Sequence, residues 1–132
     1  MKENDVAATI VDAALAVHIG IGPGLLETVY EVVLAHELRK RGLQVERQVP
    51  VPIVYDDLKF DEGFRADLVV EDIVIVELKS QEALLPVHSK QVLTQLRLSH
   101  RKLGLLINFG EALLKNGIKR IVNGLPDEQA QL

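Results

Sequence analysis

Two β-rich segments, separated by only two residues, constrain the fold of this chain more than any other feature. Residues 64–70 and residues 73–78 are dominated by apolar and β-branched side chains. Glu71 and Asp72, which lie between them, leave no room for a helix. The two segments are therefore predicted to pair as an antiparallel hairpin near the centre of a sheet.

Helical periodicity lies on both sides of this hairpin. Apolar residues recur at helical spacing over residues 6–17 and again over residues 26–38, and Gly22, Pro23 and Gly24 break the pattern between them. A third helix is predicted over residues 86–101, starting at a proline that suits the first helical turn.

Four further strands are predicted, over residues 43–49, 51–55, 103–109 and 118–122. The first two are placed near a sheet edge, because Pro50 and Pro52 cannot donate to a ladder. The element order predicts an α/β fold, a single-domain mixed β-sheet flanked by helices. One domain is expected over residues 1–132, with its core from about 5 to 123 and a frayed tail over 124–132.

Composition limits the possible chemistry. The chain has no cysteine, which excludes disulfides, thiolate catalysis and cysteine-based zinc sites. Its net charge of -4 provides no overall attraction for a polyanion, so nucleic acid would have to bind at local basic patches. Neither a signal peptide nor an apolar run of about 18 residues is evident, so a cytoplasmic protein without membrane contact is expected.

Glu77 and Lys79 end the second segment of the hairpin. Residues two apart on a strand share a face, so this carboxylate and this ammonium point to one site while Leu78 points away. The apolar residues 73–76 indicate a buried strand, at whose end charges must be paired, hydrated or bound to a cation. The same acidic-x-Lys pattern at Asp57 and Lys59 follows no such strand and is predicted to be a solvated loop.

Asp67 joins these two residues only in one register of the hairpin. A two-residue turn would place Asp67 opposite Val76, with Glu77 on the other face. A three-residue loop pairs Val70 with Val74 and sets Asp67 opposite Glu77, with their Cβ atoms about 5 Å apart. We favour the three-residue loop, or a bulge with the same result, because paired carboxylates suit Mg²⁺ or Mn²⁺.

The chain also carries ordered family motifs. In residues 24–30, Gly24, Glu27 and Tyr30 match the pattern after which the GxxExxY protein family is named. The resemblance continues through residues 64–67, 77–79, 88–91 and 105–110. The chain thus resembles GxxExxY proteins, which belong to the PD-(D/E)XK nuclease-like superfamily, and the resemblance implies a restriction-endonuclease-like core.

The resemblance implies a role for each matching residue. Glu27, Asp67 and Glu77 would bind a metal, Lys79 would be the lysine of the site, and Gln91 the glutamine of the following helix. Where the family often has a tyrosine four residues after this glutamine, the chain has Gln95, which cannot stack. Tyr30 is expected to be a core or supporting residue, with its hydroxyl bonded to a polar neighbour.

Two functions follow as hypotheses. The leading one is a metal-dependent nuclease that hydrolyses phosphodiester bonds of nucleic acid with Mg²⁺ or Mn²⁺, using Glu27, Asp67, Glu77, Lys79 and Gln91. The alternative is a noncatalytic module that keeps the fold and binds nucleic acid or a protein partner, including a second copy of itself as a homodimer. The acidic net charge and Gln95 favour this alternative.

Overall fold

The computed structural model describes residues 2–126, and within them five strands form one mixed sheet. The sheet order follows the chain, and the pairs are antiparallel except for β3 and β4, which are parallel. The strands are β1 (Val45–Tyr55), β2 (Leu58–Val70), β3 (Val74–Lys79), β4 (Leu103–Asn108) and β5 (Ile118–Val122). This arrangement is an α/β fold with a mixed sheet flanked by helices, as predicted.

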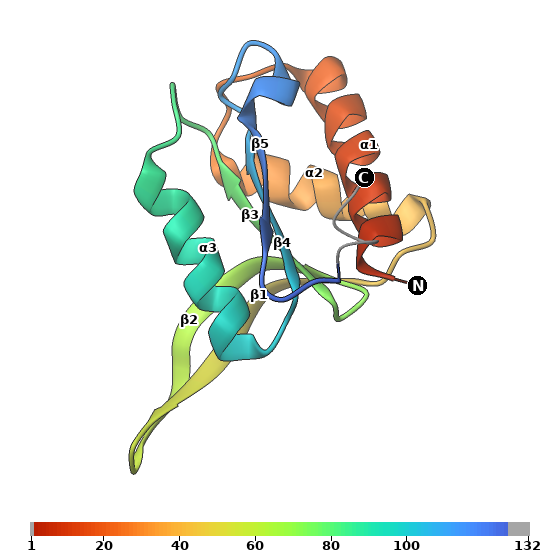
Figure 1. The fold of residues 1–132 in the computed structure, drawn as a ribbon. Coiled ribbons are helices and arrows are strands. Elements are labelled where there is room, and N and C mark those ends of the chain that lie inside the picture. The colour runs from red at the N-terminus through yellow and green to blue at the C-terminus, as the bar shows by residue number, and fades with distance from the viewer. Residues whose placement is uncertain (1, 127–132) are drawn as a thin grey trace.

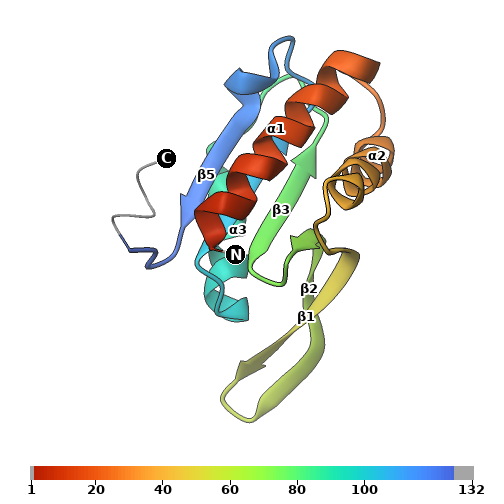
Figure 2. The same cartoon turned by 90° about the vertical axis from the view of Figure 1, so that its right-hand side faces the viewer.

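Three α-helices within the described residues cover the two faces of the sheet. They are α1 (Glu3–Ile21), α2 (Glu27–Lys40) and α3 (Pro86–Ser99), and a short 3₁₀ turn, η1 (Leu114–Gly117), precedes β5. Figure 1 shows α3 on one side of the sheet and α1 with α2 on the other. Figure 2 shows α1 lying over the strands between β3 and β5, with α2 beside it.

The side chains of the central strand β3 alternate between two hydrophobic cores, one on each face of the sheet. Val74, Val76 and Leu78 pack into the larger core with α1 and α2. Ile75 packs into the smaller core with Val92 and Leu96 of α3, so the run is buried on both faces. Because helices cover both faces of this strand, its sequence is almost continuously apolar.

Helix α1 is, by length and apolar composition, long enough to cross a membrane, and among the described helices it alone meets that test. In this structure it packs as a core helix, because Val6, Ile10, Ala13, Ala14 and Val17 are buried against the sheet. The helix ends at a local signal, since Gly22 follows it with φ of 80°.

The first strands differ from the expectation. Residues 45–55 form one continuous strand through Pro50 and Pro52, so the predicted interruption is wrong, although the predicted position at the sheet edge is confirmed. Residues 58–63 lie outside the predicted strands, but they extend β2, whose turn to β1 is at Asp56 and Asp57. Lys59 is exposed as predicted, but on a strand rather than in a loop.

The reason is that β1 and β2 stabilise each other beyond the body of the sheet. They form a long antiparallel arm that projects past α3 (Figure 1), and neither strand has other partners there. The tail also differs in part from expectation. Leu125 is buried in the larger core between the exposed Gly124 and Pro126, whereas residues 127–132 of the predicted frayed tail lie outside the described residues.

The segment after β3 is held in place by β4. Asn108 accepts hydrogen bonds from the backbone N–H groups of Gln81 and Gly110, at 2.9 and 3.1 Å, and donates to the carbonyl of Gln81 at 3.0 Å. A Cβ on Gly110 would lie 2.1 Å from the Gln81 carbonyl oxygen. The absence of a side chain at Gly110 therefore lets this loop close onto β4.

Tyr30 holds the glycine-rich loop between α1 and α2. Its hydroxyl donates to the carbonyl of Gly22 at 2.6 Å and accepts from the N–H of Leu25 at 3.1 Å. Its ring is fully buried and stacks on Phe109, with centroids 4.3 Å apart. Ser80 completes this cluster by donating from its hydroxyl to the carbonyl of Leu25, which ties the loop to the end of β3.

Gly110→Ala should destabilise the protein, since the new methyl group must displace the backbone of Gln81. We expect a loss on the order of 2 kcal/mol or more, and a melting temperature several degrees lower by circular dichroism. Gly20→Ala is the matched control, because nothing lies within 4 Å of its Cβ position in α1. That variant should be neutral or up to about 1 kcal/mol more stable, and equal effects at the two positions would contradict the proposed close approach.

Candidate functional site

The register of the central hairpin places Asp67 beside Glu77. Val70 lies opposite Val74, which confirms the three-residue loop. The ladder ends at the pair of Leu68 and Val76, because β2 diverges from β3 beyond it. There Asp67 Oδ2 accepts the backbone N–H of Leu78 at 2.8 Å, so a side chain replaces the missing backbone acceptor.

The β1–β2 ribbon changes face at this same place. Val45 packs in the core beneath α1 and α2, whereas Val49 packs against the core beneath α3. Residues four apart on a regular strand share a face, so the chain must rotate between them. Gln48, which lies between them and across from Asp67, has φ of 52°, a left-handed conformation that few non-glycine residues adopt.

Asp67 and Glu77 are half-buried, and their carboxyl groups are hydrogen-bonded to each other. Burial, followed by the charge of Asp67, raises the pKa of Glu77 to about 7, although Lys79 and a hydrogen bond from Gln95 oppose the shift. Burial also raises the pKa of Asp67, against the hydrogen bond from Leu78, and the charges of Glu31 and Glu27 add to it. The pair is therefore poised to bind a proton or another cation.

A second acidic group, Glu31, lies next to this pair and is fully partnered. It is 5% exposed, and its Oε2 accepts from Nε and a terminal nitrogen of Arg47 at 3.0 and 2.8 Å. Its Oε1 accepts from the side-chain amide of Gln48. The same amide nitrogen lies 3.4 Å from Asp67 Oδ1, so Gln48 bridges the two carboxylates.

The predicted site residues are only partly assembled. Asp67 and Glu77 touch, and the charge of Lys79 acts on Glu77. Glu27 is exposed at the first turn of α2, near enough for its charge to act on Asp67. Gln91 is exposed and lines a hollow beside the pair.

Four residues of this environment were not expected to take part. Gln95 stands where the family often has a tyrosine and was assigned no role from the sequence, yet it hydrogen-bonds Glu77. Glu31 had one usable signal, since it lies one helical turn after Glu27. Nothing in the local sequence pattern singles out Arg47 or Gln48, because their roles depend on the rotation of β1.

The donor set fits a hard cation held by two protein carboxylates. Glu77 Oε2 is buried and has no hydrogen-bond partner, so it is an acceptor with unused capacity. No group of three or more His, Cys, Asp or Glu side chains in the described part of the chain is arranged to hold a metal. Mg²⁺ does not require one, because it commonly takes one or two carboxylates and completes its shell with water and substrate phosphate.

Comparison with protein-family models agrees with the predicted restriction-endonuclease-like fold. The model described as the PD-(D/E)XK nuclease superfamily matches residues 4–121. The chain therefore belongs to the PD-(D/E)XK nuclease superfamily. No curated protein and no solved structure matched the chain.

The pKa of Glu77 predicts that the metal-free protein loses stability as the pH rises. The folded state binds this proton up to a pH of about 7, whereas the unfolded chain releases it near 4.5. The folded state therefore holds more protons between pH 4.5 and about 7, and the free energy of unfolding falls as the pH rises through this window. The loss is on the order of 2 to 3 kcal/mol.

Thermal melts in EDTA between pH 5 and pH 8 measure this effect. Glu77→Gln should flatten the profile and melt above the wild type at pH 8, because the amide carries no charge to bury. Groups that titrate elsewhere are common to both proteins and cancel in the comparison. Parallel profiles for the two proteins would show that Glu77 is not the titrating group.

Proposed function

We propose that this protein is a metal-dependent nuclease that hydrolyses phosphodiester bonds of nucleic acid with Mg²⁺ or Mn²⁺. The observation that carries the proposal is the half-buried pair of Asp67 and Glu77, in which both pKa values are raised and the buried Glu77 Oε2 has no hydrogen-bond partner. Such a pair is strained without a cation. Membership of the nuclease superfamily supports the choice of nucleic acid as substrate.

Each residue of the pair has a defined task in this proposal. Asp67 and Glu77 hold the cation, while Leu78 and Gln48 fix the two oxygens of Asp67 and Gln95 aligns Glu77. A bound divalent ion would polarise the scissile phosphate and lower the pKa of a water molecule. Lys79 shares the face of Glu77 and is placed to orient the attacking water or to stabilise negative charge that develops on the phosphate.

Glu27 and Gln91 have more distant roles in this proposal. Glu27, exposed on α2, adds negative charge at the mouth of the site and can reach the cation through water. Gln91 contacts substrate from α3. We also propose, from the positions of Gly24, Glu27 and Tyr30, that the chain belongs to the GxxExxY branch of the superfamily.

A noncatalytic binding module is the second candidate. It is favoured by Gln95, which occupies Glu77 with a hydrogen bond where family members often have tyrosine, and by the net charge of -4. In that case Asp67 and Glu77 would share a proton as a structural pair, and no hydrolysis would occur. Cleavage and metal binding distinguish the two candidates.

Cleavage should depend on Lys79 and not on the other lysine of the same pattern. In a screen of single- and double-stranded DNA and RNA with Mg²⁺ and with Mn²⁺, Lys79→Ala should lose roughly 10²- to 10³-fold in rate while its circular dichroism spectrum stays unchanged. Lys59→Ala removes the matched lysine of the exposed arm and should cleave as the wild type does. Wild-type protein that cleaves none of these substrates would favour the noncatalytic module.

Metal should stabilise the folded protein through the same carboxylates. A cation that binds only the folded state adds roughly 2.7 kcal/mol at a hundredfold excess over its Kd, which corresponds to several degrees in melting temperature. At pH 8 we expect Mn²⁺ to raise the melting temperature of the wild type relative to EDTA, and Glu77→Gln to remove the response. Glu62→Gln, which changes an exposed carboxylate paired with Arg65, should keep it. An identical wild-type melt in Mn²⁺ and EDTA would rule out a metal site at this pair.

A further inference from the structure

A hollow of about 310 Å³ lies between β2 and α3, directly beside the carboxylate pair. It is lined by Gly63, Phe64, Gln91, Thr94, Gln95 and Leu98. Its volume is at the lower end of the range for small-molecule sites. Figure 1 shows the two elements that form its walls, with α3 lying alongside the base of the β1–β2 arm.

The lining is uncharged but rich in hydrogen-bonding groups, and this decides which part of a nucleic acid it suits. Gln91 and Gln95 each carry an amide with both a donor and an acceptor, and Thr94 adds a hydroxyl. Phe64 and Leu98 supply an aromatic ring and an apolar side chain. A phosphate would require cations or convergent N–H groups, whereas a neutral planar base finds both stacking and edge contacts here.

Gln95 connects the hollow to the reacting centre. It lines the hollow and also hydrogen-bonds Glu77, and its own Oε1 is buried without a partner. A group that occupies the hollow would therefore lie next to the proposed cation ligand. In a nucleic acid strand, the group next to a reacting phosphate belongs to an adjacent nucleotide.

We propose that the hollow between Phe64 and Gln91 is a binding site for an unpaired nucleobase next to the reacting phosphate. The inference rests on the proposed nuclease function and narrows its substrate class. A base inside a duplex is stacked and paired, so it reaches such a site only when it is single-stranded or extruded. The preferred substrates are therefore single strands, loops and ends.

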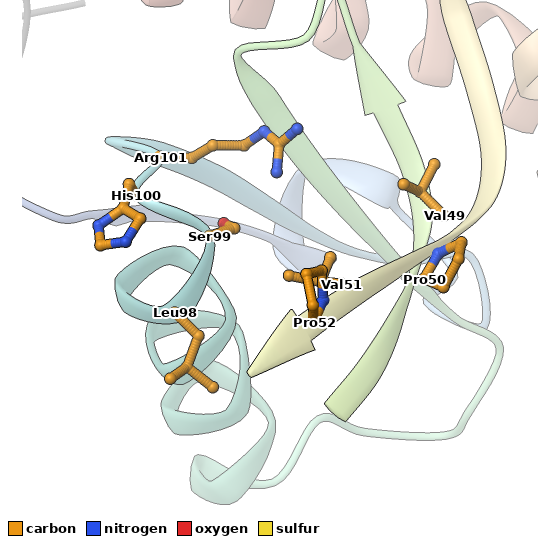
Figure 3. Close-up of a pocket in the computed structure, with 8 residues that line it drawn as sticks. All are labelled: Val49, Pro50, Val51, Pro52, Leu98, Ser99, His100 and Arg101. Atoms are coloured by element: carbon orange, nitrogen blue, oxygen red, sulfur yellow. The ribbon is translucent and has the colours of Figure 1, made fainter. Parts of the chain in front are cut away.

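The surface beyond the hollow is compatible with a strand that continues past it. A second hollow of about 280 Å³ shares Leu98 with the first and lies between the end of α3 and residues 49–52 of β1. Figure 3 shows Leu98, Ser99 and His100 on one side of it and Pro50 and Pro52 on the other. Arg101 also lines it but is tied to Asp72 at 2.9 Å, so it serves the β2–β3 turn.

Binding of a labelled oligonucleotide, measured by fluorescence anisotropy in EDTA, tests the base site without requiring cleavage. The probes are a mixed-sequence DNA strand, the same strand with its bases replaced by abasic sites, and the corresponding duplex. All three carry phosphates, but only the first presents unpaired bases. The intact strand should bind about tenfold or more tightly than the abasic strand and the duplex, as expected for base stacking on an aromatic side chain.

Variants assign the effect to the hollow. Phe64→Leu, which keeps an apolar side chain, and Gln91→Ala, at an exposed helix position, should each reduce the difference between intact and abasic strands at least threefold. Gln44→Ala is the matched control, because it removes an exposed glutamine outside the hollow, and it should leave the difference unchanged. Circular dichroism verifies that each variant folds.

The outcomes separate this inference from the proposed function. Equal affinity for intact and abasic strands, tighter binding of the duplex, or no measurable binding of any probe would overturn the base site. A preference for the intact strand that is lost in both variants would support it even if no cleavage is ever seen. Cleavage without that preference would support the nuclease and reject the base site.

Discussion

The hydrogen bond from the N–H of Leu78 to Asp67 is the interaction on which the site depends. It lies where β2 leaves β3, at the point where the backbone ladder can no longer satisfy the strand. A buried N–H without a partner is costly, so the carboxylate takes the place of a carbonyl. Glu77 is then held next to Asp67, because β4 keeps β3 in parallel register as far as the pair of Lys79 and Asn108. The two carboxylates are therefore brought together at the point where β2 separates from β3.

The acidic groups of Glu31 and Glu77 lie close together, and their environments differ. Glu31 is neutralised by Arg47 and has hydrogen bonds on both oxygens, as a buried structural charge requires. Glu77 is opposed only partly by Lys79 and keeps one oxygen without a partner. Glu31 is therefore a fully paired structural charge, whereas Glu77 keeps an oxygen with the capacity to accept a cation.

Contacts between distant segments bring the motifs together. Ser80 and Tyr30 both bind the glycine-rich loop, so this loop, the end of β3 and the start of α2 form one unit. Asn108 extends it to β4 by holding the backbone of Gln81. Tyr30 and Asn108 therefore direct their side-chain hydrogen bonds to backbone groups, and these bonds fix the loops next to the end of β3.

Local sequence was sufficient wherever the periodicity of one segment decides the outcome. The apolar run before Glu77 identified a buried strand, and its alternation separated Leu78 from Glu77 and Lys79. The affinity of paired carboxylates for a divalent cation favoured the register that pairs Val70 with Val74. The bonded hydroxyl of Tyr30 was foreseen in the same way, from the polar group on a buried ring. Only the tertiary structure decided that Gln48 rotates the β1 strand, that Glu31 joins the environment of Asp67, and that Gln95 bonds Glu77. Side-chain alternation is a property of a few neighbouring residues, whereas the contacts of Gln48, Glu31 and Gln95 join segments that lie far apart in the chain.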